Sequence, residues 1–401
     1  MTLRVALIAG PDPGHAFNAL GLGVVLAARG HDVTIGTGTQ HQRAAEDAGL
    51  RFVELPLLAP TARDGDMGHL IWGRGAEMAP PLAELLRPLR LDVVVSDVLT
   101  RAGSFAAELL GVPWVELSPH HLFEPDPAIP PVGMGRAPAR TWWRRRSDDR
   151  IRRAQQASLD EGAALERDVR RGLGLPPDGG EPEARLLCTL PALELEREDW
   201  PAEAHVVGPM GWEPDWPPLA PPEGTAPLVL VTDSTASTVR RSLAETALDG
   251  LRHADVRLVV TTGRDDLVVD RRGVRVGRAP HGPLLDAAAV AVGPGGGGFV
   301  AKALVRGVPL VVVPLMGDQR ETAGRVQHRG LGRQLSPRWC SPTTLRVAVE
   351  HVLADPRYTT RAREVAADAR ARGLGPDLAA GLVEAAARGA VPASAGPHGR
   401  G

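Results

Sequence analysis

Short apolar runs and helically spaced apolar residues alternate at the start of the chain. Residues 3–9 form an apolar run, and apolar positions then recur at helical spacing over 16–29, before Gly30. The next apolar run lies within 31–37. A short apolar run predicts a buried parallel strand, whereas the longer, spaced pattern predicts a helix. The opening therefore predicts a β-α-β unit with a right-handed crossover.

The same alternation continues in both halves of the chain. Further apolar runs lie at 52–55, 93–95 and 114–117 in the first half, and at 228–232, 256–262, 274–276, 287–292 and 308–313 in the second. Each half therefore predicts an α/β domain with a doubly wound, Rossmann-like parallel sheet. The length of 401 residues agrees, because it exceeds what one ordinary core accommodates.

The two halves are separated by a stretch from 201 to 227 that is rich in proline and glycine and has little periodicity. Such a composition predicts an interdomain linker. We place the first domain at 1–205, the linker at 206–226 and the second domain at 227–390, and we expect the tail at 391–401 to be disordered.

A tryptophan pair followed by three arginines interrupts the first half. Trp142, Trp143, Arg144, Arg145 and Arg146 precede a helical stretch that ends near residue 172. One interpretation is contact with an anionic membrane surface, where indoles and cations bind. The other is a solvated helix face with buried indoles. We favour the second, because no long amphipathic run accompanies the pair.

The richest chemistry lies in a glycine loop of the second half. The apolar run 287–292 leads through Gly293 and Pro294 into Gly295–Gly298, and a helically spaced stretch follows. Glycines let backbone N–H groups approach a ligand, and the start of a helix carries partial positive charge. The loop is therefore a candidate phosphate or diphosphate cradle, although a flexible turn or tight helix packing would also use glycines.

The residues after this loop resemble a known signature. The segment is similar to the donor site of GT-B-fold, nucleotide-sugar-dependent glycosyltransferases that decorate antibiotics and other natural products. Matching residues are Gly295, Gly296, Gly298, Ala303, Leu304, Gly307, Val308, Pro309, Val311, Pro314, Asp318, Gln319, Ala323, Arg325 and Val326. The resemblance implies two Rossmann-like domains facing across a cleft, with a last helix, here 378–387, that crosses back to the first domain.

Four residues depart from the family pattern. Pro294 stands where the family has a diphosphate-contacting His, and Phe299 where it has a phosphate-binding Thr. Lys302 replaces the Glu that holds the ribose hydroxyls, and Thr322 replaces an Asn. These departures concern the donor and not the fold. The family also implies that Asp318 and Gln319 hold sugar hydroxyls.

His15 is the candidate general base. It follows the first predicted strand in a Pro-Gly-His turn, and an imidazole has an unperturbed pKa near neutrality. The resemblance implies the same role, because Gly14 and His15 match the family's N-terminal motif. Asp97, just past another strand, is the candidate partner that fixes the His tautomer, with Ser96 as a weaker candidate. A helix cap is the alternative role for Asp97.

Two further loops match the family's donor site loosely. Ser234 and Thr235 fall where the family has a loop against the donor phosphates. Arg278 and His281 fall in a segment similar to the family's W-x-P-Q-x-x-L-L, with Arg278 in place of the aromatic that would stack on the base. A guanidinium can stack on a base, so Arg278 is consistent with an altered nucleotide site. Ordinary turn chemistry would also account for both loops.

Composition limits the class of protein. The net charge of −2 gives no reason to expect a nucleic-acid partner. Cys188 and Cys340 are the two cysteines of the chain, which are too few for a disulfide framework or a cysteine-built zinc site. We therefore expect a cytoplasmic protein, and no residue pattern predicts a metal site or a bound cofactor.

The leading hypothesis is a metal-independent, inverting glycosyltransferase that moves a hexose-type sugar from a UDP or TDP sugar to a small-molecule hydroxyl, with His15 as base and Asp97 as its partner. The rival hypothesis is a catalytically silent relative that binds a small molecule or assists another enzyme. A third is a transferase for an unusually anionic donor, because Lys302 and Arg278 add positive charge. The acceptor and the oligomeric state stay open.

Overall fold

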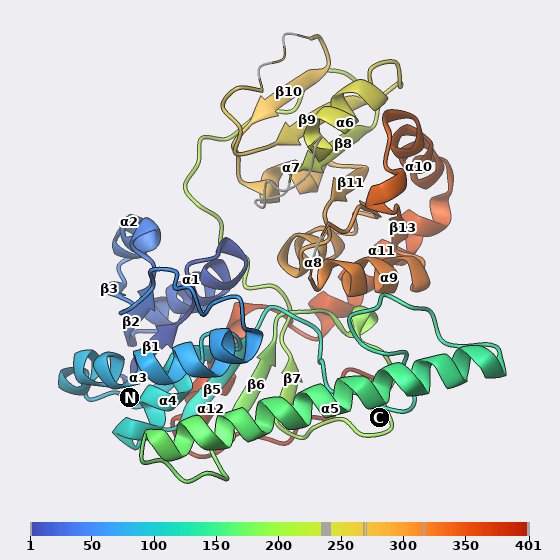
Figure 1. The fold of residues 1–401 in the computed structure, drawn as a ribbon. Coiled ribbons are helices and arrows are strands. Elements are labelled where there is room, and N and C mark those ends of the chain that lie inside the picture. Colours follow the sequence, from blue (N-terminus) through green and yellow to red (C-terminus); the bar gives the residue numbers. More distant parts are fainter. Residues whose placement is uncertain (1, 234–241, 268, 270, 316, 399–401) are drawn as a thin grey trace.

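The chain folds around two parallel sheets (Figure 1), seen in a computed structural model that describes residues 2–233, 242–267, 269, 271–315 and 317–398. In the described residues, the first sheet has the order β3-β2-β1-β4-β5-β6-β7 and the second the order β10-β9-β8-β11-β12-β13, with every pair parallel. The predicted α/β fold with two doubly wound sheets is confirmed.

The strands of the first sheet are β1 (Arg4–Ile8), β2 (Asp32–Thr37), β3 (Arg51–Glu54), β4 (Val93–Asp97), β5 (Trp114–Ser118), β6 (Ala184–Leu187) and β7 (Ala204–Val206). Those of the second are β8 (Leu228–Thr232), β9 (Arg257–Thr261), β10 (Val274–Gly277), β11 (Val290–Gly293), β12 (Leu310–Val312) and β13 (Gly332–Gln334). The central strands are buried along their whole length, as strands covered by helices on both faces must be.

The helices are α1 (Pro13–Ala28), α2 (Gln42–Asp47), α3 (Arg74–Leu86), α4 (Ala102–Leu110), α5 (Trp142–Gly172), α6 (Leu243–Gly250), α7 (His281–Ala287), α8 (Gly297–Leu304), α9 (Gln319–His328), α10 (Pro342–Ala354), α11 (Pro356–Ala371) and α12 (Pro376–Ala386). The observed strands begin and end within two residues of most of the predicted runs, and the largest difference is at 287–292, which the apolar run predicts to be a strand throughout. Ala287 instead ends α7, and β11 begins at Val290. Alanine suits a helix better than a strand, which explains the difference.

In each sheet, the order in which the chain adds strands reverses at a central strand. β1 lies between β2 and β4, and β8 lies between β9 and β11. In open α/β sheets, ligands bind beyond the carboxyl ends of the strands at this point, because the flanking connections leave in opposite directions. The loops after β1 and β4, and those after β8 and β11, are therefore where the topology places binding residues.

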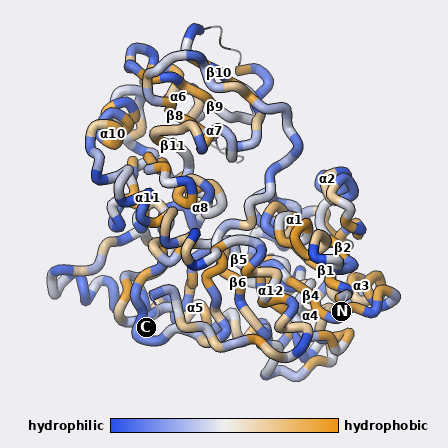
Figure 2. Tube along the Cα trace, turned by 180° about the vertical axis from the view of Figure 1, so that it is seen from behind, coloured by the Kyte–Doolittle hydropathy of each residue, from blue (hydrophilic) through white to orange (hydrophobic). Residues whose placement is uncertain are grey.

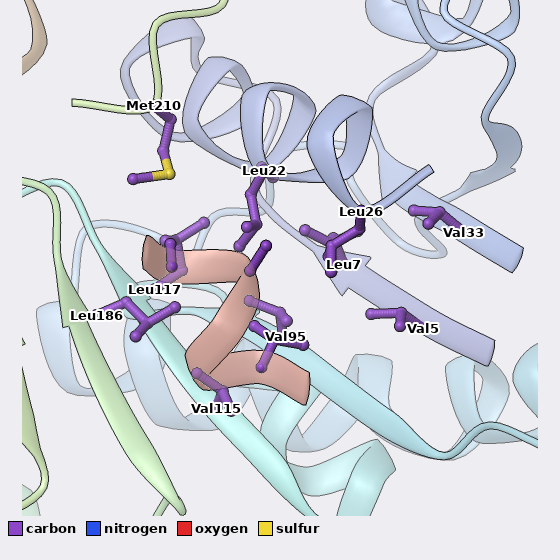
Figure 3. Close-up of a cluster of buried hydrophobic side chains, with 14 of the residues drawn as sticks. Val5, Leu7, Leu22, Leu26, Val33, Val95, Val115, Leu117, Leu186 and Met210 are labelled. Carbon is purple, nitrogen blue, oxygen red and sulfur yellow. The ribbon is translucent and has the colours of Figure 1, made fainter. Parts of the chain in front are cut away.

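Helix α12 packs into the first half although it comes from the end of the chain. Ala379, Ala380 and Val383 belong to the same buried cluster as the strands of the first sheet and α1. Figure 3 shows this helix, in pale red, packed against those strands and next to α1. Arg29 at the end of α1 also pairs with Asp377, with Nη2 2.9 Å from Oδ1. The expected crossing of the last helix to the first half is confirmed.

The linker is fixed at its first end. Residues 207–227 form no helix or strand and are all described. Met210 is buried in the first core, where Figure 3 shows it above Leu22. A Cβ at Gly21 would lie 2.4 Å from the Met210 carbonyl oxygen, so α1 needs glycine at this position. The linker therefore leaves the first half at a defined point.

A buried ion network joins the two halves. Arg325 on α9 donates from Nη1 to Glu194 at 2.9 Å and from Nε to Glu321 at 2.8 Å. His121, after β5, lies 3.2 Å from the other Glu194 oxygen. Burial works against ionisation of Glu194, but the Arg325 charge and the His121 hydrogen bond lower its pKa to about 2. The two halves therefore meet through charges that must stay paired.

The tryptophan pair projects from the body of the molecule. Trp142 and Trp143, at the start of α5, are 66% and 61% exposed. The expectation of buried indoles is therefore wrong, because this end of α5 extends beyond the sheet (Figure 1). Contact with an anionic membrane surface stays a prediction. Within the described residues, no helix has the length and apolar character needed to span a membrane.

The described part of the tail is hydrogen-bonded to the first half, and the expected disorder of residues 391–401 stays a prediction. The Ser394 backbone N–H donates to the Ala202 carbonyl at 2.6 Å, and His398 lies 3.1 Å from the Glu194 carbonyl oxygen. These backbone partners give residues 391–398 a defined path along the first half.

The hydropathy view in Figure 2 shows hydrophobic residues gathered along the central strands of both halves. The proposed domain boundaries stay a prediction.

Candidate active site

A cavity of about 350 Å³ lies between the two halves. It is lined from the first half by the start of α1 and the loop after β5, and from the second half by the glycine loop and the start of α9. The predicted site residues that line it are His15, His281, Gly296, Gly297, Gly298, Phe299, Lys302, Asp318 and Gln319. The structure thus brings most of the predicted site residues together at the carboxyl ends of both sheets.

His15 and Asp97 form a close pair on one wall of this cavity. His15 Nδ1 lies 2.6 Å from Asp97 Oδ1, and the Asp97 side chain is 2% exposed. Thr100 donates to the second oxygen, Oδ2, from its backbone N–H and its hydroxyl. Asp97 therefore holds both His15 and the turn before α4. Ser96 instead donates to the Thr100 carbonyl, so it is not the partner of His15.

The surroundings of His15 favour its protonated form. Burial acts to lower the pKa of His15, but the hydrogen bond and charge of Asp97, together with the charges of Asp12 and Asp318, raise it above 6.5. Because Asp97 engages Nδ1, the other ring nitrogen, Nε2, is the one available to a ligand on the cavity side. This is the arrangement in which a carboxylate fixes the tautomer of a histidine that accepts a proton.

A second histidine and carboxylate pair crosses the cleft. His120, in the loop after β5, has Nδ1 3.2 Å from Asp318 Oδ2 at the start of α9. The ring of His120 meets that of His15 edge to face, with centroids 5.3 Å apart. Burial acts to raise the pKa of Asp318, but His120 lowers it overall. Asp318 is therefore held ionised in the cavity, and His120 connects the two walls.

The glycine loop uses its glycines in three different ways. Gly295 has a φ of +93°, which a side chain rarely adopts. A Cβ on Gly297 would lie 2.7 Å from the Pro119 carbonyl oxygen of the first half, so glycine here allows the halves to approach. A Cβ on Gly296 or Gly298 would meet nothing within 4 Å. These last two positions therefore face open space beside the first N–H groups of α8.

Lys302, the departure from the expected Glu, is paired with a carboxylate of the linker. Its Nζ lies 2.9 Å from Glu213 Oε1, and both side chains are 15% exposed. Glu213 also accepts from the backbone N–H groups of His281 at 3.0 Å and Gly282 at 2.9 Å. Burial acts to raise the pKa of Glu213, but the Lys302 charge and the Gly282 N–H lower it overall.

His281 is half-buried beside this pair and is held neutral. Its Nε2 shares a hydrogen bond of 2.9 Å with the Thr261 hydroxyl. Burial and the nearby Lys302 charge lower the pKa of His281 to about 4. The Phe299 ring meets the imidazole edge to face at 5.2 Å. Phe299 therefore fills the wall of the cavity where the family resemblance implies a hydroxyl.

Arg278 lies further out, whereas Gln319 lines the first cavity from the start of α9. Arg278 lines a wider cavity of about 1020 Å³ that continues from the first, and its Nη2 donates to the Gly263 carbonyl at 2.8 Å. The Gln319 side-chain oxygen accepts from the Leu315 N–H at 2.9 Å. Ser234 and Thr235 lie outside the described residues, so their predicted contact with donor phosphates stays a prediction.

Sequence reasoning missed His120, Trp212 and Glu213. His120 had a usable signal, because it follows the apolar run 114–117 just as Asp97 follows 93–95. Trp212 and Glu213 had none, because they lie in the stretch that its composition marks as a spacer. Trp212 contacts the ring of Phe17 at 4.7 Å between centroids, and Glu213 follows it into the second half. The linker is therefore part of the cavity wall.

Sequence comparison identifies relatives over nearly the whole chain. Residues 245–385 match the family described as erythromycin biosynthesis protein CIII-like, C-terminal domain. The chain is 30% identical to 4'-demethylrebeccamycin synthase of Lentzea aerocolonigenes, in an alignment that covers 96% of this chain and 100% of that protein. Such identity across full length shows common family membership.

Solved structures share the fold. The glycotransferase of kitacinnamycin superposes with a TM-score of 0.77 at 24% identity, covering 96% of this chain and 99% of that one. A glycosyltransferase from Streptomyces sp. SF2575, complexed with thymidine diphosphate, superposes with a TM-score of 0.65 at 21% identity, covering 95% and 99%. At these identities, the superpositions establish the architecture alone.

Proposed function

Because the chain belongs to the natural-product glycosyltransferases of the GT-B fold, we propose that it moves a sugar from a nucleoside diphosphate to a hydroxyl of a small-molecule acceptor, with inversion at the anomeric carbon. The observation that carries this proposal is the His15 and Asp97 pair, which lies across the cavity from the glycine loop. Its geometry suits a general base opposite a site for a leaving diphosphate.

The proposed reaction is a single displacement. His15 Nε2 takes the proton of the acceptor hydroxyl while the hydroxyl oxygen bonds to the anomeric carbon. The bond from that carbon to the diphosphate oxygen breaks, and the electron pair leaves with the diphosphate. Asp97 stabilises the imidazolium that forms. Because attack and departure occur on opposite faces of the sugar, the configuration inverts.

The charge on the leaving diphosphate is assigned to the start of α8. The first N–H groups of a helix lack partners within it and carry partial positive charge. Gly296 and Gly298 leave the space beside these groups open. In this proposal the backbone, rather than a metal, offsets the developing charge. We assign to Asp318 the role of accepting hydrogen bonds from hydroxyls of the transferred sugar.

The two rival hypotheses receive less support. A silent binder has no use for His15 held at 2.6 Å by a buried carboxylate. An unusually anionic donor was suggested by the charges of Lys302 and Arg278. Lys302 is paired with Glu213 at 2.9 Å, and Arg278 lies 3.5 Å from Asp265, so each of these charges already has a carboxylate of the protein beside it. A nucleotide sugar of the UDP or TDP type is therefore the proposed co-substrate.

Calorimetric titration with UDP, TDP and GDP tests this proposal together with the role of the glycine loop. The wild-type protein is expected to bind at least one of them. Gly298→Ala places a methyl group in the open space beside the helix start, so it should weaken that binding at least tenfold. Alanine is the better helix former by about 1 kcal/mol, so the variant should be no less stable. A folded protein that binds none of the three would contradict the proposal.

The pH dependence of kcat/KM tests His15 as the base. A base acts in its neutral form, so the rate should rise with pH through the pKa of His15. Because that pKa is raised, the midpoint of the rise is expected above pH 6.5. In Asp97→Asn the lowering effect of burial remains without the charge that opposes it, so the midpoint should move to lower pH. A wild-type midpoint below 6.5 would argue against this assignment.

A further inference from the structure

The linker places a carboxylate inside the cavity at the point where Lys302 departs from the family pattern. Glu213 approaches α7 and α8 from outside their own sheet, 89 residues before Lys302 in sequence. It is held by three donors: the Lys302 ammonium and the N–H groups of His281 and Gly282. Three hydrogen bonds from two elements fix the direction of this side chain.

Glu213 and Asp318 lie at opposite ends of the cavity wall formed by the glycine loop and α8. The start of the glycine loop lies against the start of α9, because a Cβ on Gly295 would lie 3.2 Å from the Gln319 carbonyl oxygen. Lys302 lies at the other end, in the last turn of α8 and beside α7. In the proposed complex, a diphosphate at the helix start would lie between these two ends of the wall, with the transferred sugar on the Asp318 side and the nucleoside on the Glu213 side.

Glu213 has one acceptor position left for a ligand. A carboxylate offers about four lone-pair directions, two on each oxygen. Oε1 accepts from Lys302 and His281, and Oε2 accepts from Gly282 alone. Glu213 lines the cavity, so the remaining position on Oε2 can accept a hydrogen bond from a hydroxyl group.

We propose that Glu213 binds a hydroxyl of the donor's nucleoside sugar, and that Lys302 is the positioning residue that holds Glu213 in place. This inference rests on the proposed function. It assigns the linker a direct part in donor binding, and it gives Lys302 a role different from attraction of an anion. The carboxylate that α8 lacks is supplied by another segment of the chain.

Titration of Glu213→Gln tests the inference with three probes: TDP, UDP and inorganic pyrophosphate. The glutamine keeps one oxygen for Lys302 and His281 but replaces Oε2 with an amide nitrogen that cannot accept a hydrogen bond. Affinity for the better-bound nucleoside diphosphate is expected to fall at least tenfold. Affinity for pyrophosphate, which has no sugar hydroxyl, should change less than about twofold, whereas a merely structural loss would weaken both.

Two variants of Lys302 and a control complete the test. Lys302→Met should weaken nucleotide binding less than Glu213→Gln, because the two backbone N–H groups still hold the carboxylate. Lys302→Glu should also weaken it, because the new carboxylate would face Glu213, although the family pattern alone predicts improvement. Glu364→Gln removes an exposed ion pair with Arg361 on α11, and neither residue lines the two cavities. It should leave all affinities unchanged.

The possible failures are distinguishable. Wild-type protein that binds neither nucleotide would overturn the proposed function and this inference with it. If the wild-type protein binds a nucleotide and Glu213→Gln binds it equally tightly, the inference alone is overturned. Equal weakening of nucleotide and pyrophosphate binding in a folded variant would also overturn it, because the effect would then come from the glycine loop.

Discussion

His15→Ala is expected to lower kcat by about 10²–10⁴-fold, the usual contribution of a general base. The variant removes the one imidazole of the cavity that is held at 2.6 Å by a buried carboxylate. Nucleoside diphosphate affinity should stay close to that of the wild type, because the glycine loop and the start of α8 are untouched. Steady-state rates with an acceptor found in a panel of hydroxylated compounds, together with calorimetry, measure the two effects separately.

His120→Ala is the matched control for this prediction. His120 lines the same cavity and also has a carboxylate partner, but that pair is longer at 3.2 Å and more exposed. If His120 only connects the walls and orients Asp318, its loss should lower kcat much less than the loss of His15. A larger fall in kcat for His120→Ala would reassign the base. If His15→Ala lowered nucleotide affinity by as large a factor as it lowers kcat, His15 would have a binding role instead.

Arg325→Met is expected to cost about 3–5 kcal/mol of unfolding free energy, because it leaves buried carboxylates without their cation. Glu194 and Glu321 both bond to Arg325, and all three side chains are nearly inaccessible to water. Urea denaturation followed by circular dichroism measures the change. Arg346→Met removes an exposed ion pair with Glu350 on α10 and should cost under about 1 kcal/mol. Similar midpoints for the two variants would contradict the prediction.

Acid should produce a related loss in the wild-type protein. The pKa of Glu194 is lowered from 4.5 to about 2 in the folded state, so the folded state binds its proton less readily than the unfolded state. The stability that this carboxylate contributes is fully present above pH 4.5 and declines as the pH falls toward 2. In Arg325→Met this dependence on pH should be reduced, because the charge that favours the ionised form is gone.

Much of the fold follows from pattern alone, because parallel strands buried on both faces give unbroken apolar runs. The pairing of His15 with Asp97 was also within reach, since each residue ends or follows a strand near the switch point. The tertiary partner of Lys302 was not within reach. The charge of Lys302 suggested an anionic ligand, whereas its ammonium group donates to Glu213, 89 residues earlier in the chain. Local sequence predicts the strand, loop or helix in which a residue lies, whereas its tertiary contacts are known only from the packed structure.

The linker is the clearest example of this limit. Proline and glycine predict a spacer, and residues 207–227 indeed form no helix or strand. Composition carries no information about which side chains of a spacer are anchored. Met210 enters the first core, and Glu213 binds the second half. His120 and Asp318 were likewise invisible as a pair, because they are 198 residues apart and belong to different sheets.

The position of α12 has a consequence for synthesis of the protein. The first half of the chain emerges from the ribosome long before residues 376–386 are synthesised, yet these residues complete the core around α1. The bonds from Arg29 to Asp377 join residues 348 apart. The first half therefore waits, with an apolar surface uncovered, until translation ends, and such exposure favours aggregation. A hybrid enzyme that exchanges the second half with a relative should accordingly keep its native α12 with the first.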